Sequence, residues 1–271
     1  MSVVYDFTGK VVLITGSSAG MGEGIALLFA KSGANVVITG RNAERVAKVA
    51  KQCTDVSPKQ LTALEVVGNL TNKEDCNRLI ETTVQTFGKI DVLVNNAGID
   101  CLVEITDECY YEKFLTTINT NLNIAVYMTH KCVPYLAKTR GNIINIATIG
   151  AKRASSDSSP YNISKAALIM FTKCMAAELG PKHHIRVNVV NPGITLTDFE
   201  CESMGFNREE SDRKLTAIGI QLPVGRVGQV SDTASIVGYL ASNAAEFITG
   251  SEYVADGGQL VGNVFDSNTD Y

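Results

Sequence analysis

A tyrosine and a lysine four residues apart are the first residues of this chain that could carry out chemistry. Tyr161 and Lys165 belong to a segment with helical periodicity, and on a helix positions i and i+4 share one face. A free tyrosine has a pKa near ~10. A neighbouring ammonium lowers that pKa toward the neutral range, where acid–base catalysis is most efficient. The pair therefore predicts a phenol that exchanges a proton with a bound substrate.

Spacing alone does not single out this pair, because Tyr127 and Lys131 repeat it. The surroundings of the two pairs differ. Thirteen residues before the first tyrosine stands Thr148, directly after the apolar run 143–147, whereas Phe114 occupies the matching position before the second. A hydroxyl at the end of a buried strand can hold a substrate carbonyl oxygen where the proton must go. We therefore assign the chemistry to the first pair together with this threonine.

Alternating strands and helices must position these groups. Short apolar segments predict strands at residues 10–15, 35–39, 61–67, 90–94, 142–147, 185–190 and 251–255. Helical periodicity predicts helices at residues 20–31, 43–53, 73–87, 109–137, 160–179 and 231–240, with an irregular polar stretch at 195–221. Strands that alternate with helices through short loops form a doubly wound parallel sheet. We predict a single α/β domain over residues 1–271, Rossmann-like, with seven parallel strands and helices on both faces.

Composition argues against several classes of protein. The 271 residues are 45% hydrophobic and 19% charged, with a formal net charge of −4, which is ordinary for a globular protein. No basic run favours nucleic acid, and no apolar run approaches the ~18 residues of a membrane span. We recognise no targeting pattern at either end. We expect a cytoplasmic protein that binds neither nucleic acid nor a membrane.

The cysteines and histidines lack the spacing of metal ligands. Seven scattered cysteines without a Cys-x-x-Cys pair indicate reduced thiols. The three histidines form no metal-binding pattern with them. We predict no metal.

A glycine-rich loop joins the first predicted strand to the first predicted helix. Residues 15–22 read Thr-Gly-Ser-Ser-Ala-Gly-Met-Gly. Glycines let the backbone approach a pyrophosphate closely, and a helix N-terminus offers free N–H groups to it. We expect a dinucleotide to contact Gly16, Ser18, Ala19, Gly20, Met21 and Gly22.

The same loop also fits a hydrolase pattern. Residues 16–20 match Gly-x-Ser-x-Gly, the nucleophile elbow of serine hydrolases. The rival hypothesis is a hydrolase in which Ser18 works with His130, His183 or His184. An elbow strand normally has sheet partners earlier in the chain, whereas only a short tail precedes this one. The dinucleotide interpretation is therefore preferred.

The end of the second predicted strand indicates which dinucleotide is bound. Sites for NAD usually place a carboxylate there, on the ribose 2′-hydroxyl. Here Gly40 offers no carboxylate, and Arg41 offers a planar, permanently charged fork that suits a 2′-phosphate. The alternative is a solvated arginine without a ligand. We predict NADP(H).

Taken in order, these motifs resemble the classical short-chain dehydrogenase/reductase family over nearly the whole chain. The ordered set comprises the loop at 15–22, Asn-Asn-Ala-Gly at 95–98, Asn121, Tyr161 with Lys165, Asn-Pro-Gly at 191–193 and Asp-Gly-Gly at 256–258. The resemblance implies a hydride transfer between a nicotinamide and a carbonyl or alcohol.

The resemblance also implies roles for individual residues. Tyr161 would donate the proton in reduction and accept it in oxidation, while Lys165 lowers its pKa and holds the nicotinamide ribose. Asn121 would shape a proton-relay water. Ile194 and Thr197 would hold the carboxamide. Beyond the glycine loop, the implied cofactor contacts are Arg41, Asn42, Asn69, Leu70, Asn96, Ala97, Gly98, Tyr161, Lys165, Pro192, Gly193, Ile194 and Thr197.

Two positions depart from the family pattern. Thr148 stands where the family usually has a catalytic serine; threonine keeps the hydroxyl but has a stiffer χ1. Nearby substitutes would be Ser155, Ser156, Ser158 and Ser159. Asn69 stands where an aspartate commonly accepts from the adenine amine, and its carbonyl oxygen can still accept. Because of Thr148, a cofactor-binding module without turnover stays as an alternative.

The stretch at 195–221 matches the mobile substrate lid of the family. Its apolar residues Phe199, Met204, Phe206 and Leu215 join Ile99, Leu102 and Ile149. They favour an apolar steroid, 3-oxoacyl, isoprenoid or xenobiotic carbonyl, unless they only pack the lid down.

The predicted helices at 109–137 and 160–179 form subunit interfaces in many members of the family. Both carry apolar residues on more than one face. We therefore expect a homotetramer, with a dimer as the alternative.

Overall fold

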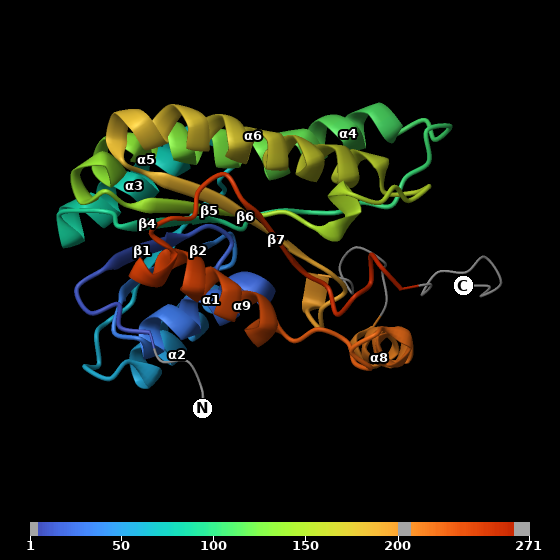
Figure 1. Cartoon of the computed structure of the whole chain (residues 1–271), viewed down its shortest axis with the longest axis horizontal. Coiled ribbons are helices and arrows are strands. Elements are labelled where there is room, and N and C mark those ends of the chain that lie inside the picture. The colour runs from blue at the N-terminus through green and yellow to red at the C-terminus, as the bar shows by residue number, and fades with distance from the viewer. Residues whose placement is uncertain (1–4, 200–206, 263–271) are drawn as a thin grey trace.

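Seven parallel strands form a single sheet in the order β3-β2-β1-β4-β5-β6-β7 (Figure 1). The computed structural model describes residues 5–199 and 207–262. The strands are β1 (Val11–Ile14), β2 (Asn35–Gly40), β3 (Leu64–Val67), β4 (Val92–Asn95), β5 (Asn142–Ile146), β6 (Arg186–Pro192) and β7 (Glu252–Ala255). The chain reverses its direction of sheet growth between β1 and β4, and such a switch point is where α/β sheets bind ligands. The predicted doubly wound parallel sheet is confirmed.

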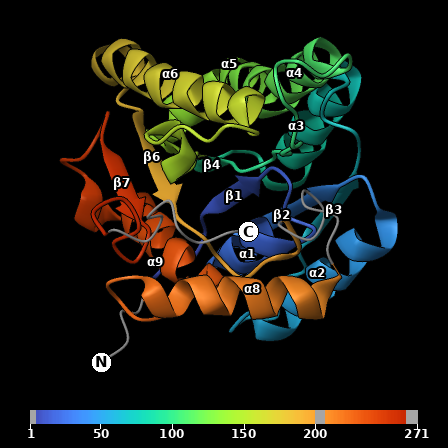
Figure 2. The ribbon, with the colours of Figure 1, turned by 90° about the vertical axis from the view of Figure 1, so that its right-hand side faces the viewer.

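Helices cover both faces of this sheet (Figure 2). One layer consists of α1 (Gly20–Lys31), α2 (Ala43–Val56) and α9 (Val230–Ala241). The opposite layer consists of α3 (Lys73–Phe87), α4 (Tyr110–Ile118), α5 (Ile124–Thr139) and α6 (Ser159–His183). Figure 1 places α8 (Arg208–Gln221) outside both layers, beyond the carboxyl ends of the strands.

Most of the core belongs to two large hydrophobic clusters, one on each side of the sheet. Successive side chains of a strand point to opposite faces, so Val12 and Ile14 of β1 pack with Phe29 of α1. Leu13 packs with Met128 of α5 on the other face. All four β1 residues are buried, which explains why the strand reads as a continuous apolar run instead of an alternating one.

The predicted helix at 109–137 is three segments. Between α4 and α5 lies a π-helical turn, Asn119–Asn123. Single π-helical turns inside α-helices occur mainly at functional sites, and Asn121 is at the centre of this one. The apolar periodicity continues across the turn, so the pattern could not reveal it.

The predicted irregular stretch at 195–221 is wrong in its second half, which forms α8. Asn207 caps the N-terminus of α8, where its side chain accepts from Glu210 N at 2.9 Å. Ion pairs between Arg208 and Asp212 and between Lys214 and Glu210 stabilise the surface of the helix. Polar helices of this kind lack the apolar stripe on which a sequence prediction depends. A smaller correction concerns β3, which begins at Leu64 and not at residue 61.

Two further searches cover the described residues only. None of the helices there is long and apolar enough to cross a membrane. Within residues 5–199 and 207–262, no three His, Cys, Asp or Glu side chains come together as a metal-binding group.

Candidate active site

The predicted catalytic residues gather where β4 and β5 end. Lys165 projects from α6 to the last residue of β5, donating from Nζ to Ile146 O at 2.9 Å. The same Nζ lies 5.8 Å from the ring centroid of Tyr161. Thr148 stands two residues beyond the strand. The fold therefore brings the phenol and the cation together and places Thr148 just beyond the strand end that Lys165 contacts.

Burial alters the lysine. Only 3% of Lys165 is exposed, and the loss of solvent lowers the pKa of its ammonium to about 8, against an opposing effect of Asp100. An ammonium with this pKa is still mainly charged at neutral pH. A positive charge with little water around it stabilises a neighbouring phenolate more strongly than an exposed one does.

Asn121 connects the loop after β4 to α6. Its Oδ1 accepts from Ile99 N at 2.8 Å, and its Nδ2 donates to Ile99 O at 2.9 Å and to Ser164 Oγ at 3.0 Å. Ser164 Oγ in turn donates to Tyr161 O at 2.7 Å. Both polar atoms of Asn121 thus hold protein groups, which makes positioning its visible role in the site.

Gly98 packs tightly against these side chains. A Cβ atom on Gly98 would lie 3.2 Å from Lys165 Nζ and 3.3 Å from Asn121 Oδ1. The backbone of the Asn-Asn-Ala-Gly motif therefore passes directly over the catalytic lysine.

Thr148 is oriented by the short 3-10 turn that follows it, Ile149–Ala151. Its Oγ1 accepts from Gly150 N at 3.2 Å. Because a hydroxyl has one donor and two acceptor sites, this bond leaves the O–H free to donate to a ligand. Two of the predicted substitutes are engaged elsewhere: Ser159 Oγ pairs with Tyr110 Oη at 2.8 Å, and Ser158 Oγ lies 3.5 Å from Asp100 Oδ2.

The apolar part of the site includes Phe199, whose ring lies 5.9 Å from that of Tyr161. Leu102 is partly exposed, whereas Leu215, a residue of α8, is buried. Leu215 thus packs the α8 segment down, which is the structural alternative to a substrate contact. Met204 and Phe206 lie outside the described residues.

The glycine loop forms a tight cradle after β1. Gly16 and Gly20 have φ values of +63° and +56°, a region that favours glycine. A Cβ atom on Gly22 would lie 2.3 Å from Gly16 O. Asn96 Nδ2 donates to Thr15 O and Gly16 O at 3.0 and 3.1 Å, so the cradle is tied to the loop after β4.

Thr15 is a site residue that sequence reasoning missed. Its Oγ1 accepts from Asn96 N at 2.9 Å and from Ala97 N at 3.0 Å. A hydroxyl residue at the carboxyl end of a strand, directly before the glycine loop, is the signal that could have identified it.

The end of β2 lies against the same cradle. Thr39 N donates to Ser17 Oγ at 2.9 Å, and a Cβ atom on Gly40 would lie 2.2 Å from Ser18 Oγ. Arg41 follows, and its side chain is exposed. The Ser18 hydroxyl therefore lies directly over Gly40, and the exposed Arg41 is the next residue in the chain.

Two of the predicted cofactor contacts have side chains engaged within the chain. Asn42 Oδ1 accepts from Arg45 N at 2.9 Å, so Asn42 caps the N-terminus of α2. Asn69 Oδ1 accepts from Thr71 N and Thr71 Oγ1 at 3.3 and 3.0 Å. The neighbouring Leu70 is buried.

The loop after β6 closes the cradle from the other side. A Cβ atom on Gly20 would lie 3.6 Å from Thr197 Cβ, and one on Gly193, the residue after Pro192, would lie 2.8 Å from Asp256. Ile194 N donates to Gln259 Oε1 at 3.0 Å. The Asp-Gly-Gly turn at 256–258 thus packs against this loop and supports it. Gln259 was also missed by sequence reasoning.

The second Tyr-x-x-x-Lys pair lies on a different surface. Tyr127 donates to Asn77 Oδ1 of α3 at 3.0 Å, and Lys131 Nζ lies 5.7 Å from its ring. The hydrogen bond of Tyr127 joins α5 to α3. The pair thus has a structural contact, and Phe114 provides no hydroxyl for chemistry.

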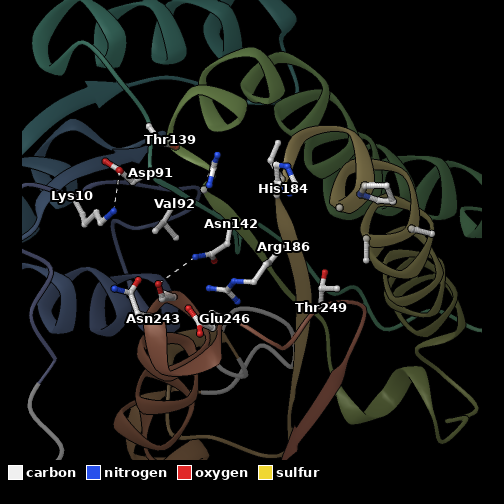
Figure 3. Close-up of a pocket in the computed structure, with 18 residues that line it drawn as sticks. Lys10, Asp91, Val92, Thr139, Asn142, His184, Arg186, Asn243, Glu246 and Thr249 are labelled. Atoms are coloured by element: carbon white, nitrogen blue, oxygen red, sulfur yellow. Dashed lines mark hydrogen bonds and ion pairs between the residues drawn. The ribbon is translucent and has the colours of Figure 1, made fainter.

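A cavity of about 790 Å³ lies at the opposite edge of the sheet (Figure 3). Val92, Asn142 and Arg186, the first residues of β4, β5 and β6, line it together with His184. Arg186 donates to Leu240 O at 2.8 Å, at the end of α9. Arg186 therefore stabilises the end of α9.

The positions of the histidines bear on the hydrolase alternative. His183 and His184 end α6 near the amino ends of the strands, whereas Ser18 follows the carboxyl end of β1. His130 is exposed on α5. No histidine hydrogen bond to Ser18 occurs among the described residues, so the geometry gives the hydrolase interpretation no support.

The arrangement fits a dinucleotide: a glycine cradle at a helix N-terminus and a switch point, with a phenol, an ammonium and a hydroxyl beyond it. A family model described as enoyl-(acyl carrier protein) reductase matches residues 16–259. The chain therefore belongs to the short-chain dehydrogenase/reductase family.

Individual relatives agree with this assignment. Cyclohexanol dehydrogenase from Acinetobacter sp. is 36% identical over 253 residues, covering 93% of this chain and 95% of its own. A 3-oxoacyl-(acyl-carrier-protein) reductase, FabG, from Thermotoga maritima is 35% identical over 256 residues, covering 93% and 98%.

Among solved structures, a short-chain dehydrogenase/reductase of unknown function from Caenorhabditis elegans, determined with cofactor, superposes with a TM-score of 0.87. It is 37% identical, and the match covers 94% of this chain and 96% of that one. The protein is thus an oxidoreductase that uses a nicotinamide nucleotide.

Proposed function

We propose that this protein is an NADP(H)-dependent reductase that converts a ketone or aldehyde to an alcohol, reversibly. The observation that carries the proposal is the buried Lys165 beside Tyr161. Lys165 contacts the last residue of β5, and the Thr148 hydroxyl follows two residues beyond that strand. When bound, the cofactor supplies the hydride. The residues of the chain handle the proton.

The proposed roles follow from the contacts. The free O–H of Thr148 donates to the substrate oxygen and holds the carbonyl in place. Tyr161 then gives its proton to that oxygen, and the Lys165 ammonium stabilises the phenolate left behind. Asn121 keeps Ile99 and the neighbouring Gly98 in position over the lysine.

The choice of NADP(H) rests on the end of β2. A carboxylate at position 40 would collide with Ser18 Oγ, because even a Cβ atom there would lie 2.2 Å away. The serine hydroxyl and the exposed Arg41 guanidinium both suit a 2′-phosphate. Because cells keep the NADP pool mainly reduced, we expect reduction to be the direction in the cell.

An apolar carbonyl compound is the proposed substrate. Phe199 lies beside Tyr161, and Leu102 and Ile149 follow the carboxyl ends of β4 and β5. These apolar side chains favour an apolar ring or chain. Relatives named for cyclohexanol and for 3-oxoacyl groups support this class. Steroid, isoprenoid and xenobiotic carbonyls belong to the same chemical range.

We also infer a cytoplasmic homotetramer, with a dimer second. Exposed apolar side chains line the outer helical layer on α4, α5 and α6, namely Tyr111, Leu115, Val126, Ile163 and Met170. Apolar residues gathered on one exposed layer favour a partner subunit. A monomer at micromolar concentration in sedimentation would contradict this inference.

The test is NADPH consumption by the purified protein with an activated diketone or a quinone. We expect turnover that disappears in Tyr161→Phe while NADPH still binds. NADPH binding without turnover across a carbonyl panel would favour the alternative of a cofactor-binding module. Failure to bind NADPH while NADH binds would overturn the cofactor proposal.

A further inference from the structure

Asp100 is an acidic residue in the wall of the site that the proposed mechanism does not use. It follows Gly98 and Ile99 on the loop after β4. Its Oδ1 accepts from Cys101 N at 2.8 Å, and its Oδ2 lies 3.5 Å from Ser158 Oγ. Ser158 is buried and directly precedes α6. The carboxylate therefore lies between the loop after β4 and the start of the catalytic helix.

The position of this carboxylate is fixed from both sides. Before it, Ile99 is held at N and O by Asn121. After it, Val103 N donates to Asp157 O at 2.7 Å and joins the loop to the segment before α6. Asp100 is thus held on a strap that is anchored at two points around the site.

The charges that act on Asp100 come from the elements packed against it. Burial, with a smaller contribution from the Asp157 charge, raises the pKa of its carboxyl to about 6; the hydrogen bonds from Cys101 N and Ser158 Oγ and the charge of Lys165 on α6 oppose this rise. The π-helical turn contributes only the neutral Asn121. Asp100 has no ion pair within 4.0 Å among residues 5–199 and 207–262. Burying a carboxylate without a close cation lowers the stability of the folded protein. A neutral residue at this position would avoid that loss of stability.

We propose that Asp100 is a positioning residue that sets the protonation of the Tyr161–Lys165 pair; the inference rests on the catalytic roles proposed above. A Cβ atom on Gly98, two residues before Asp100, would lie 3.2 Å from Lys165 Nζ, and Ser158, which donates to Asp100 Oδ2 at 3.5 Å, stands three residues before Tyr161. A negative charge at this place opposes the loss of a proton from either member of the pair. While Asp100 is ionised, Tyr161 stays a proton donor and Lys165 stays an ammonium to higher pH. Below about pH 6 Asp100 takes up its own proton, and the effect ends.

The direct test measures the ionisation of Tyr161 without any substrate. Phenolate absorbance in the near ultraviolet is titrated with pH in the wild type and in Tyr161→Phe, and the difference isolates this tyrosine. The same pair of titrations is then made with Asp100→Asn in both proteins. We expect the titration midpoint to fall by about half a pH unit to one unit when the carboxylate is removed.

Asp157→Asn is the matched control. It removes the same charge from the segment that packs against Asp100, but among the described residues only Asp100 shifts the pKa of Lys165 by its charge. We expect a shift less than half as large. An unchanged midpoint in Asp100→Asn, a rise, or an equal shift in the control would overturn the proposal.

A second readout uses the reaction. In the wild type the alkaline limb of kcat/KM for reduction should lie at higher pH than in Asp100→Asn, by the same amount as in the absorbance titration. Below about pH 6 the two profiles should have the same shape, since Asp100 is then neutral. Should Asp100→Asn not fold, Asp100→Ser keeps an acceptor for Cys101 N and tests the same charge.

The two readouts separate the two proposals. If no carbonyl compound is reduced, the proposed function fails, and the absorbance titration still decides the role of Asp100. If reduction occurs but neither readout moves, the role of Asp100 fails alone.

Discussion

Asn121 holds both backbone polar groups of Ile99. The amide oxygen accepts from Ile99 N at 2.8 Å, and the amide nitrogen donates to Ile99 O at 2.9 Å. One side chain on a π-helical turn thus fixes the strap between Gly98 and Asp100, and with it the wall around the catalytic lysine.

Removing this side chain should damage stability and turnover together. Asn121→Ala leaves two backbone groups without partners, at a cost of about 1–3 kcal/mol in the free energy of unfolding, and kcat should fall at least about tenfold. Asn123→Ala is the control, because that residue is exposed on the same turn. Urea denaturation and NADPH consumption measure both effects. Equal losses in the two variants would contradict the positioning role.

The buried lysine predicts a pH-dependent stability difference. The pKa of Lys165 in the folded protein, about 8, lies below its ordinary value of 10.5, so the unfolded chain binds this proton more tightly. Burying the charged lysine therefore lowers the free energy of unfolding. This loss of stability is complete below pH 8 and disappears as the pH rises toward 10.5. Lys165→Met removes it, so the stability of the variant relative to wild type should fall by about 1–3 kcal/mol across that range. Urea denaturation at several pH values measures this, and a constant difference would refute it.

The threonine prediction concerns the hydroxyl and not the methyl group. Thr148→Ala should lower kcat by about 10²–10³-fold, the usual loss of one donor to a reacting oxygen. Thr148→Ser keeps the hydroxyl and should stay within about tenfold of wild type. Ser155→Ala serves as the control on the neighbouring loop. Activity retained in Thr148→Ala would exclude this hydroxyl from the reaction.

Arg41 predicts the choice between the two cofactors. Arg41→Ala should weaken NADPH binding at least about tenfold, because a charge-assisted bond to a phosphate is lost. The affinity for NADH should change little. Arg45→Ala, on the first turn of α2, is the control, and fluorescence titration measures both affinities. The same loss for both cofactors would remove Arg41 from the 2′-phosphate site.

Two glycines in helices should respond differently to alanine. In Gly22→Ala the new Cβ would lie 2.3 Å from Gly16 O, so the loop must move, and cofactor affinity should fall by tenfold or more, about 1.4 kcal/mol. Gly180→Ala meets nothing within 4 Å and should be neutral or stabilise the protein by up to about 1 kcal/mol. Cofactor titration and thermal unfolding distinguish them. Wild-type affinity in Gly22→Ala would show that the tight cradle is unnecessary.

The sequence alone was enough for the sheet and most of its helices, because those elements depend on local patterns. Buried parallel strands require continuous apolar runs, and β1 and β5 have them. The order of motifs also identified the Tyr161–Lys165 pair and separated it from Tyr127, since a hydroxyl residue precedes only the first. The structure brings the four predicted catalytic residues to one edge of the sheet; their individual roles stay predictions.

Only the tertiary structure decided the features that depend on contacts between distant segments. The apolar period does not change at the π-helical turn, so nothing local indicates that Asn121 turns toward Ile99. The polar surface of α8 hides its helical state, which depends on its cap and ion pairs. Asp100 has an ordinary sequence context, and its unusual pKa arises from burial against the start of α6, a segment more than fifty residues away. Local patterns specify which elements form, whereas desolvation and packing between elements determine what a side chain in them can do.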